Sequence, residues 1–114
     1  MSKKIFIVYG HHDIKKSFNA SVRDTFIEEA KKLGYQIDLI NLHEEKPIPF
    51  FDGSGPNDQI LDYRKRLEAS DVLFMISPCY NLRATAILEN WIDLTLAPKW
   101  FFSFKKLVGN WGYP

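Results

Sequence analysis

Two short apolar runs and one partly alternating segment divide this chain, and longer segments of mixed polar and apolar residues separate them. The runs are IFIV at 5–8 and VLFMIS at 72–77, and the partly alternating segment between them is YQIDLINL at 35–42. A short apolar run bounded by turn residues is typical of a strand buried on both faces of a parallel sheet. We therefore predict three strands, of which the first and the third are fully buried.

The segment over 19–33 has the spacing of a helix with one apolar face. Val22, Phe26, Ile27 and Ala30 share that face, whereas Arg23 belongs to the polar remainder. Gly34 follows the last periodic residue and is a favourable helix stop. This segment is predicted to be the helix that connects the first two strands.

Two further helices are predicted, over 58–70 and over 85–96. Asn57 or Asp58 is a suitable cap for the former, and Pro98 ends the latter. The residues expected to face inward from the helix over 58–70 are Ile60, Leu61, Tyr63 and Leu67. Between strand and helix, residues 43–58 contain three prolines and two glycines, so an irregular loop is expected there.

The order is therefore strand, helix, strand, helix, strand, helix. This alternation predicts an α/β fold with an open parallel sheet and helices on both faces, and 114 residues form a single domain over 1–114. Ligands of such sheets bind beyond the carboxyl ends of the strands. The loops over 10–19 and 78–85 lie at those ends and are the candidate site.

Composition excludes several classes of function. The net charge is +1 with mixed signs, so no basic stripe indicates nucleic-acid binding. No apolar run approaches the ~20 residues of a membrane span, and the start lacks the pattern of a signal peptide. One cysteine excludes an internal disulfide. A cytoplasmic protein is expected.

The first strand, its polar loop and a helix that opens on Ser17 and Asn19 have the layout of a phosphate site. A helix start carries unpaired N–H groups and a partial positive charge. Ser17 and Asn19 are also ordinary helix caps, so both roles stay open. His11 and His12 add possible donors; a metal site needs three or four converging ligands, and none is expected here.

Three segments together resemble a known family. They are YGHHDIKKSFNASVRD at 9–24, ISPCYNLRATAILENWIDLTLAP at 76–98 and KWFFSFKKL at 99–107. In this order they resemble the flavodoxin-like NAD(P)H:quinone oxidoreductases, a family that includes modulators of drug activity and ancillary subunits of bacterial potassium-efflux systems.

The resemblance implies a flavodoxin-like domain that binds FAD, or alternatively FMN, without a covalent bond and often forms a homodimer. Its flavin takes hydride from NADH or NADPH and passes two electrons to a quinone or similar small acceptor, so no side chain is needed as nucleophile or base. By motif, the residues that hold the flavin phosphate and its linker would be His11, Ser17, Phe18 and Asn19. Those along the flavin ring would be Pro78, Cys79, Tyr80, Asn81 and Leu82, and those of the substrate pocket Phe102 and Phe104.

Departures from the family pattern support a second hypothesis. Asn81 replaces a tryptophan, Thr85 a proline and Glu89 a lysine, and the family continues into two further strands beyond Pro114. A fragment or a shortened member is expected, with the third strand as an apolar edge that dimerisation or strand exchange would cover. The alternative function is a binding or regulatory module with weak or no flavin binding, acting through a partner such as a membrane transporter.

Overall fold

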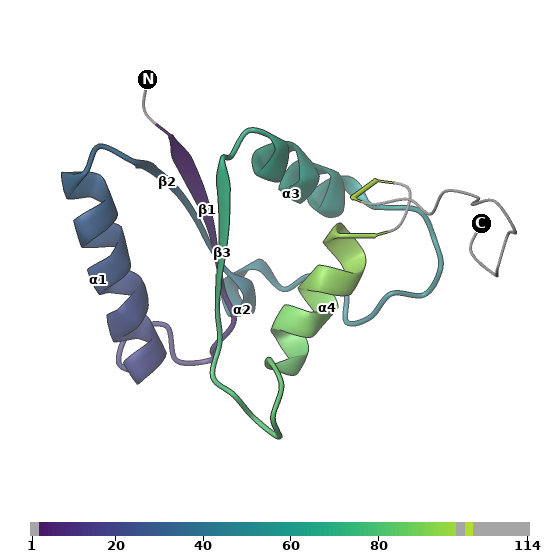
Figure 1. Cartoon of the computed structure of the whole chain (residues 1–114). Helices are drawn as coiled ribbons and strands as arrows, with labels where there is room; N and C mark the ends of the chain where they lie inside the picture. Colours follow the sequence, from purple (N-terminus) through teal and green to yellow (C-terminus); the bar gives the residue numbers. More distant parts are fainter. Residues whose placement is uncertain (1–2, 98–99, 102–114) are drawn as a thin grey trace, which may run out of the picture.

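The computed structural model describes residues 3–97, 100 and 101. Its elements are β1 (Lys4–Tyr9), α1 (Phe18–Lys32), β2 (Gln36–Asn41), α2 (Leu42–Glu45), α3 (Asp58–Glu68), β3 (Val72–Ile76) and α4 (Ala86–Thr95). The strands form a parallel sheet in the order β2-β1-β3 (Figure 1). The predicted α/β fold is confirmed.

The central strand β1 is buried on both faces. Ile5, Ile7 and Tyr9 point to the apolar layer beneath α1, whereas Phe6 and Val8 point to the layer beneath α3 and α4. None of these five side chains is more than 5% exposed. The continuous apolar run at 5–8 is therefore part of a strand buried on both faces of the sheet, as predicted from the sequence.

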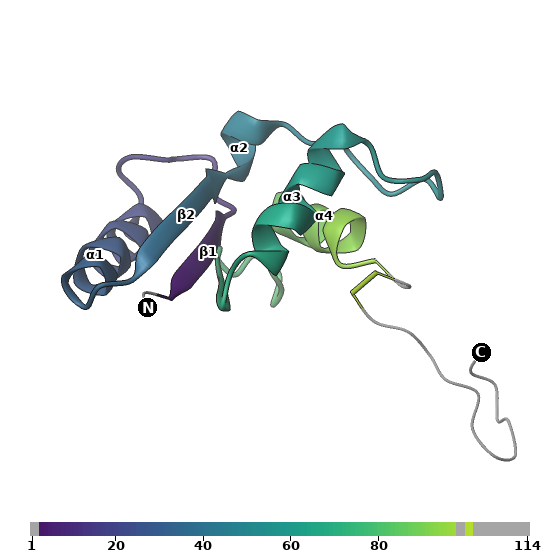
Figure 2. The ribbon, with the colours of Figure 1, turned by 90° about the horizontal axis from the view of Figure 1, so that it is seen from above.

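Helix α1 covers one face of the sheet, and Figure 2 shows it across the strands from α3 and α4. The predicted apolar face was wrong at two positions, because Arg23 is 6% exposed and Val22 is 37% exposed. The buried stripe runs through Ala20, Arg23 and Ala30. Arg23 can lie there because its guanidinium forms hydrogen bonds with polar groups. The spacing of apolar residues in the sequence does not reveal such bonds.

Helices α3 and α4 cover the other face. Trp91 of α4 and Tyr63 of α3 pack beside Phe6, and Asn57 caps α3 by accepting a hydrogen bond from Ile60 N–H at 2.9 Å. Leu61 was predicted to face inward but is 49% exposed. It lies outside the stripe that Ile60, Tyr63 and Leu67 direct at the sheet.

The expectation of an irregular loop over 43–58 was wrong at its start, where α2 forms a single turn. Tertiary contacts hold this turn, since Tyr63 Oη donates to Glu45 Oε1 at 3.0 Å and Gln59 Nε2 donates to the Glu45 carbonyl at 2.8 Å. The left-handed residue Lys46 ends it, with φ 49°. The proline-containing remainder, 46–57, is irregular as predicted and runs around the α3 and α4 side of the molecule (Figures 1 and 2).

Strand β3 is less buried than its apolar sequence indicates. Val72 and Met75 are 44% and 39% exposed, and only Ile76 is buried. Within the described residues β3 pairs with β1 alone, which makes it the expected edge strand. The prediction of a fully buried third strand was wrong because one side of this strand meets no neighbour in the described part of the chain.

Candidate functional site

The loops that follow β1 and β3 lie side by side at the carboxyl edge of the sheet. Gly10 N–H donates to the Ile76 carbonyl at 2.8 Å, and Thr85 Oγ1 donates to the Gly10 carbonyl at 2.8 Å. A Cβ at Gly10 would stand 3.0 Å from Leu88 Cβ and 3.1 Å from Thr85 Oγ1, so a larger residue here would press against the side chains of α4 and its cap. The two loops predicted as the site are therefore neighbours.

Asp13 organises the loop between β1 and α1. Its carboxylate accepts hydrogen bonds from the N–H groups of Lys15 and Lys16 at 3.0 and 2.8 Å. These two bonds, the one from Lys16 first, hold the pKa of Asp13 below its ordinary value. The loop therefore carries a negative charge that its own backbone N–H groups stabilise.

Ser17 caps α1, as the sequence predicts. Its Oγ accepts from Ala20 N–H at 3.0 Å and lies 2.7 Å from Tyr9 Oη, which also donates to the Asp13 carbonyl at 2.7 Å. The last residue of β1 thus ties the loop to the helix start. Phe18, the next residue, is 81% exposed and lines a shallow apolar groove along α1 with Val22 and Phe26.

Arg23 is a positioning residue that sequence reasoning missed. Its guanidinium donates to the Ile14 carbonyl at 2.7 Å and to Asn41 Oδ1 at 3.0 Å, and it stands over the Tyr9 ring at 4.5 Å. It thereby joins the loop, α1 and the end of β2. An arginine in register with Ala20 and Ala30 on a helical stripe is the signal that could have revealed it.

The loop after β3 contains a two-residue hairpin turn. Tyr80 and Arg83 exchange backbone hydrogen bonds at 3.2 Å, and Asn81 and Leu82 between them have φ values of 52° and 62°. This geometry is that of a type I′ turn, which favours asparagine at the first position and glycine at the second. Leu82 adopts it while 96% exposed.

A cavity of about 360 Å³ opens between the two loops. It is lined by Gly10, His11, His12, His43, Tyr80, Thr85, Ala86 and Ile87. Of the predicted site residues it brings together His11 and Tyr80. Ser17, Phe18 and Asn19 lie at the start of α1, and Pro78, Cys79, Asn81 and Leu82 lie on the β3–α4 loop, without lining this cavity.

Other predictions fall elsewhere. Phe102 and Phe104 lie outside the described residues. His43 is exposed, as the sequence predicts, but it belongs to α2 and not to a loop, and it lines the cavity. Over 3–97, 100 and 101, no group of three or more His, Cys, Asp or Glu side chains is arranged to hold a metal ion. None of the described helices is long and apolar enough to cross a membrane.

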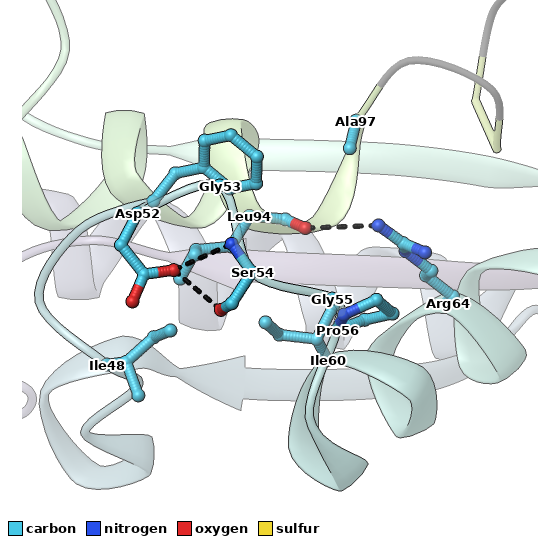
Figure 3. A pocket seen from close by; sticks show the side chains of 11 residues that line it. Ile48, Asp52, Gly53, Ser54, Gly55, Pro56, Ile60, Arg64, Leu94 and Ala97 are labelled. Atoms are coloured by element: carbon cyan, nitrogen blue, oxygen red, sulfur yellow. Dashed lines mark hydrogen bonds between the residues drawn. The ribbon is translucent and has the colours of Figure 1, made fainter.

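A second cavity, of about 510 Å³, lies between the 46–57 segment, α3 and the end of α4 (Figure 3). Its polar groups are already paired: Arg64 donates to the Leu94 and Thr95 carbonyls, and Asp52 accepts from Ser54. The remaining wall is largely apolar, with Ile48 and Ile60 among its residues. The cavity at the carboxyl edge, with its histidines, is therefore the better candidate for polar chemistry.

Comparison with known sequences shows the family to which the chain belongs. A family model described as a flavodoxin-like fold matches residues 3–112. The chain belongs to this flavodoxin-like family. The site described above lies where open α/β sheets of this kind bind their ligands.

The chain is similar to several quinone reductases. It is 31% identical over 100 residues to the FMN-dependent NADH:quinone oxidoreductase of Mycoplasma mobile. The aligned region covers 78% of this chain and 48% of that protein. It is 25% identical to the rat (Rattus norvegicus) ribosyldihydronicotinamide dehydrogenase [quinone], over 88% of the chain and 54% of that protein. The chain thus spans about half the length of the curated relatives it matches.

Solved structures have the same fold. The NAD(P)H:quinone oxidoreductase from Methanothermobacter marburgensis superimposes with a TM-score of 0.79 at 19% identity, covering 89% of this chain and 55% of that one. Smu.1420 from Streptococcus mutans UA159 superimposes with a TM-score of 0.78 at 25% identity, covering 91% and 58%. These likenesses, too, span little more than half of the solved chains.

Proposed function

We propose that the chain acts as a flavin-dependent NAD(P)H oxidoreductase that transfers two electrons to quinones or similar acceptors. The observation that carries the proposal is the meeting of the β1–α1 loop and the β3–α4 loop around one cavity, in a chain whose relatives are named as quinone oxidoreductases. FAD is the proposed flavin and FMN the alternative, since one of those relatives is named as FMN-dependent.

The residues present fit a flavin nucleotide. The loop before α1 offers His11, the capped start at Ser17 and the cations Lys15 and Lys16, which suit a phosphate. Tyr80, Ala86 and Ile87 provide an apolar wall, which suits a flat ring system. Both kinds of surface open on the same edge of the sheet.

In this proposal the flavin, when bound, supplies the hydride chemistry, and the chain binds and orients it. His11, Ser17, Phe18 and Asn19 hold the phosphate and its linker. Backbone groups of Pro78, Cys79, Tyr80, Asn81 and Leu82 run along the ring, where the tight turn at 81–82 limits movement. Phe102 and Phe104 are proposed for the acceptor pocket. Arg23 acts indirectly, because it holds the β1–α1 loop in place through a hydrogen bond to the Ile14 carbonyl.

We further propose a cytoplasmic homodimer, with NADH or NADPH as the electron donor. The exposed edge of β3 and the apolar groove that Phe18, Val22 and Phe26 form on α1 support association, because exposed apolar surface of this kind tends to be covered.

A second candidate function is a binding or regulatory module that works through a protein partner and binds flavin weakly or not at all. Asn81 favours it, because it stands where the family pattern has an aromatic side chain and because it forms part of a tight turn with an exposed Leu82. The span of about half of each relative favours it as well.

Flavin binding separates the two candidates. The purified chain would be titrated with FAD, FMN and riboflavin while flavin fluorescence and absorbance near about 450 nm are followed, and then assayed for NADH- and NADPH-dependent quinone reduction. The double variant Ser17→Ala, Asn19→Ala should weaken nucleotide binding, whereas Ser21→Ala, one turn further along an exposed position of α1, should not. A chain that takes up no flavin refutes the enzyme and leaves the module.

A further inference from the structure

Four rings follow one another along the carboxyl edge of the sheet. Tyr9 and His11 have centroids 6.3 Å apart, His11 and His12 stack at 4.4 Å, and His12 and His43 meet edge to face at 6.4 Å. The three histidines come from two separate segments, the β1–α1 loop and α2, and all three line the 360 Å³ cavity. All three histidines of the chain thus converge on one cavity.

Neighbouring groups constrain two of the three rings. His11 Nδ1 accepts a hydrogen bond from Asp13 N–H at 2.8 Å, so in its neutral form the ring carries its proton on Nε2. Partial desolvation, together with the positive charges that His12 and His11 can carry, lowers the pKa of His43. Three adjacent imidazoles repel one another when protonated, and an anion among them removes that repulsion.

Among the described residues that line the cavity, none is an acid that would do the same. Thr85 is the N-cap residue of α4, but its Oγ1 donates to the Gly10 carbonyl and accepts no capping hydrogen bond from the helix start; Ala86 and Ile87 follow it in the cavity wall. These residues of the wall therefore offer the histidines no negative charge.

The segments that line the cavity also carry charged groups. The acids are Asp13, Glu44, Glu45 and Glu89, and the bases are Lys15, Lys16, Lys46 and Arg83. Asp13 is engaged by the backbone of its own loop, Glu44 by Asn41, Glu45 by Tyr63, and Glu89 lies 3.9 Å from Arg83. Free carboxylates change charge near about pH 4 and free lysines near about pH 10, whereas free histidine does so near about pH 6.5.

We infer that His11, His12 and His43 form a proton-linked anion site, which receives a phosphate group of the flavin nucleotide and takes up a proton as it binds. The inference rests on the proposed function and adds two residues, His12 and His43, to its site. Binding and protonation favour each other by linkage, so the affinity for the phosphate-bearing flavin rises as pH falls.

FAD is the suitable probe, because its pyrophosphate has no group that titrates between about pH 6 and 8, whereas the phosphate of FMN does. Calorimetric titration with FAD in two buffers of different ionisation enthalpy counts the protons taken up. Riboflavin, which has no phosphate, is the matched ligand control. The variants are His12→Asn with His43→Gln, and Lys15→Gln as a control that lowers charge without removing a titrating group.

For the unmodified chain we expect uptake of roughly 0.5–1 proton per FAD at about pH 7, and a dissociation constant that tightens by roughly 5- to 30-fold from pH 8 to 6. Riboflavin should show neither effect. The histidine double variant should lose most of the slope, and Lys15→Gln should weaken FAD binding equally at every pH. Histidine C–H resonances followed by NMR should titrate at higher pH when FAD is present.

The outcomes separate the two proposals. Binding of FAD with no proton uptake, or an unchanged slope in the histidine variant, overturns the proton-linked site and leaves the proposed function standing. Absence of binding by FAD and riboflavin at every pH overturns both. Urea unfolding of each variant shows whether it is folded, so that a lost slope in a folded variant supports the inference.

Discussion

Replacing Arg23 by methionine should weaken the whole fold, although the sequence places this residue on a polar helix face. The side chain is 8% exposed and makes contacts with three elements. Methionine has similar length and good helix propensity, so the substitution removes the guanidinium while keeping α1 intact. Only the lost polar contacts and the ring contact then change the free energy of unfolding.

The magnitude follows from those contacts. The charged hydrogen bond to the Ile14 carbonyl is worth about 1.5–2 kcal/mol and the one to Asn41 about 1 kcal/mol, because both acceptors are partly buried. The contact over Tyr9 adds roughly 1 kcal/mol, whereas the pair with Asp24, which is 62% exposed, adds almost nothing. Burial of the methionine side chain returns about 1 kcal/mol. A net loss of about 2.5–3 kcal/mol remains.

Urea unfolding followed by circular dichroism measures this loss, with a corresponding fall of roughly 10 °C in Tm. Arg83→Met is the matched control, since Arg83 is 61% exposed and lies 3.9 Å from its partner Glu89; it should stay within about 0.5 kcal/mol of the parent chain. If Arg23→Met and Arg83→Met unfold at the same urea concentration, Arg23 does not hold the loop and α1 together.

Three further changes test other parts of the structure. Leu82→Gly should raise the free energy of unfolding by about 0.5 kcal/mol, because it relieves a left-handed leucine at the turn, and an unchanged or lower Tm would contradict this strain. Thr95→Val should stabilise by roughly 1 kcal/mol, since Thr95 is fully buried and its hydroxyl has no hydrogen-bond partner among the described residues; a destabilised variant would indicate a partner. Without ligand, the pKa of His43 lies below its unfolded value, so the unfolded chain binds more protons and stability should fall as pH drops below about 6.5. His43→Gln should reduce that fall in a comparison of urea midpoints at pH 7.5 and 5.5, and equal midpoint shifts in both chains would exclude the effect.

Much of the fold could be predicted from the sequence because local pattern and tertiary structure agree. The run at 5–8 is buried on both faces, and Ser17 and Asn57 cap the helices that follow them. The predictions that failed concern structure that depends on contacts between residues far apart in the sequence. Helix α2 depends on Tyr63 and Gln59, some 14–18 residues away, which no local pattern contains.

The candidate site, like the fold, could be predicted from the sequence only in part. Its two loops could be placed from strand order alone, since carboxyl ends of parallel strands share an edge. Its other components could not, because His43 enters from α2 and Arg23 depends on acceptors at Ile14 and Asn41. A buried arginine and a distant histidine have no signature in hydrophobic periodicity.

The position of β1 between β2 and β3 has a consequence for the time course of hydrogen exchange. Its backbone is bonded on both sides, with Ile7 opposite Leu39 and Phe74, and its residues from Ile5 to Tyr9 are almost inaccessible. Amides in such a strand exchange with deuterium only when the whole domain opens, whereas those of the edge strands exchange through local fraying. We therefore expect the amides of the strand that ends at Tyr9 to exchange most slowly among the described elements, and the β1–α1 loop of the site is attached to the end of this strand.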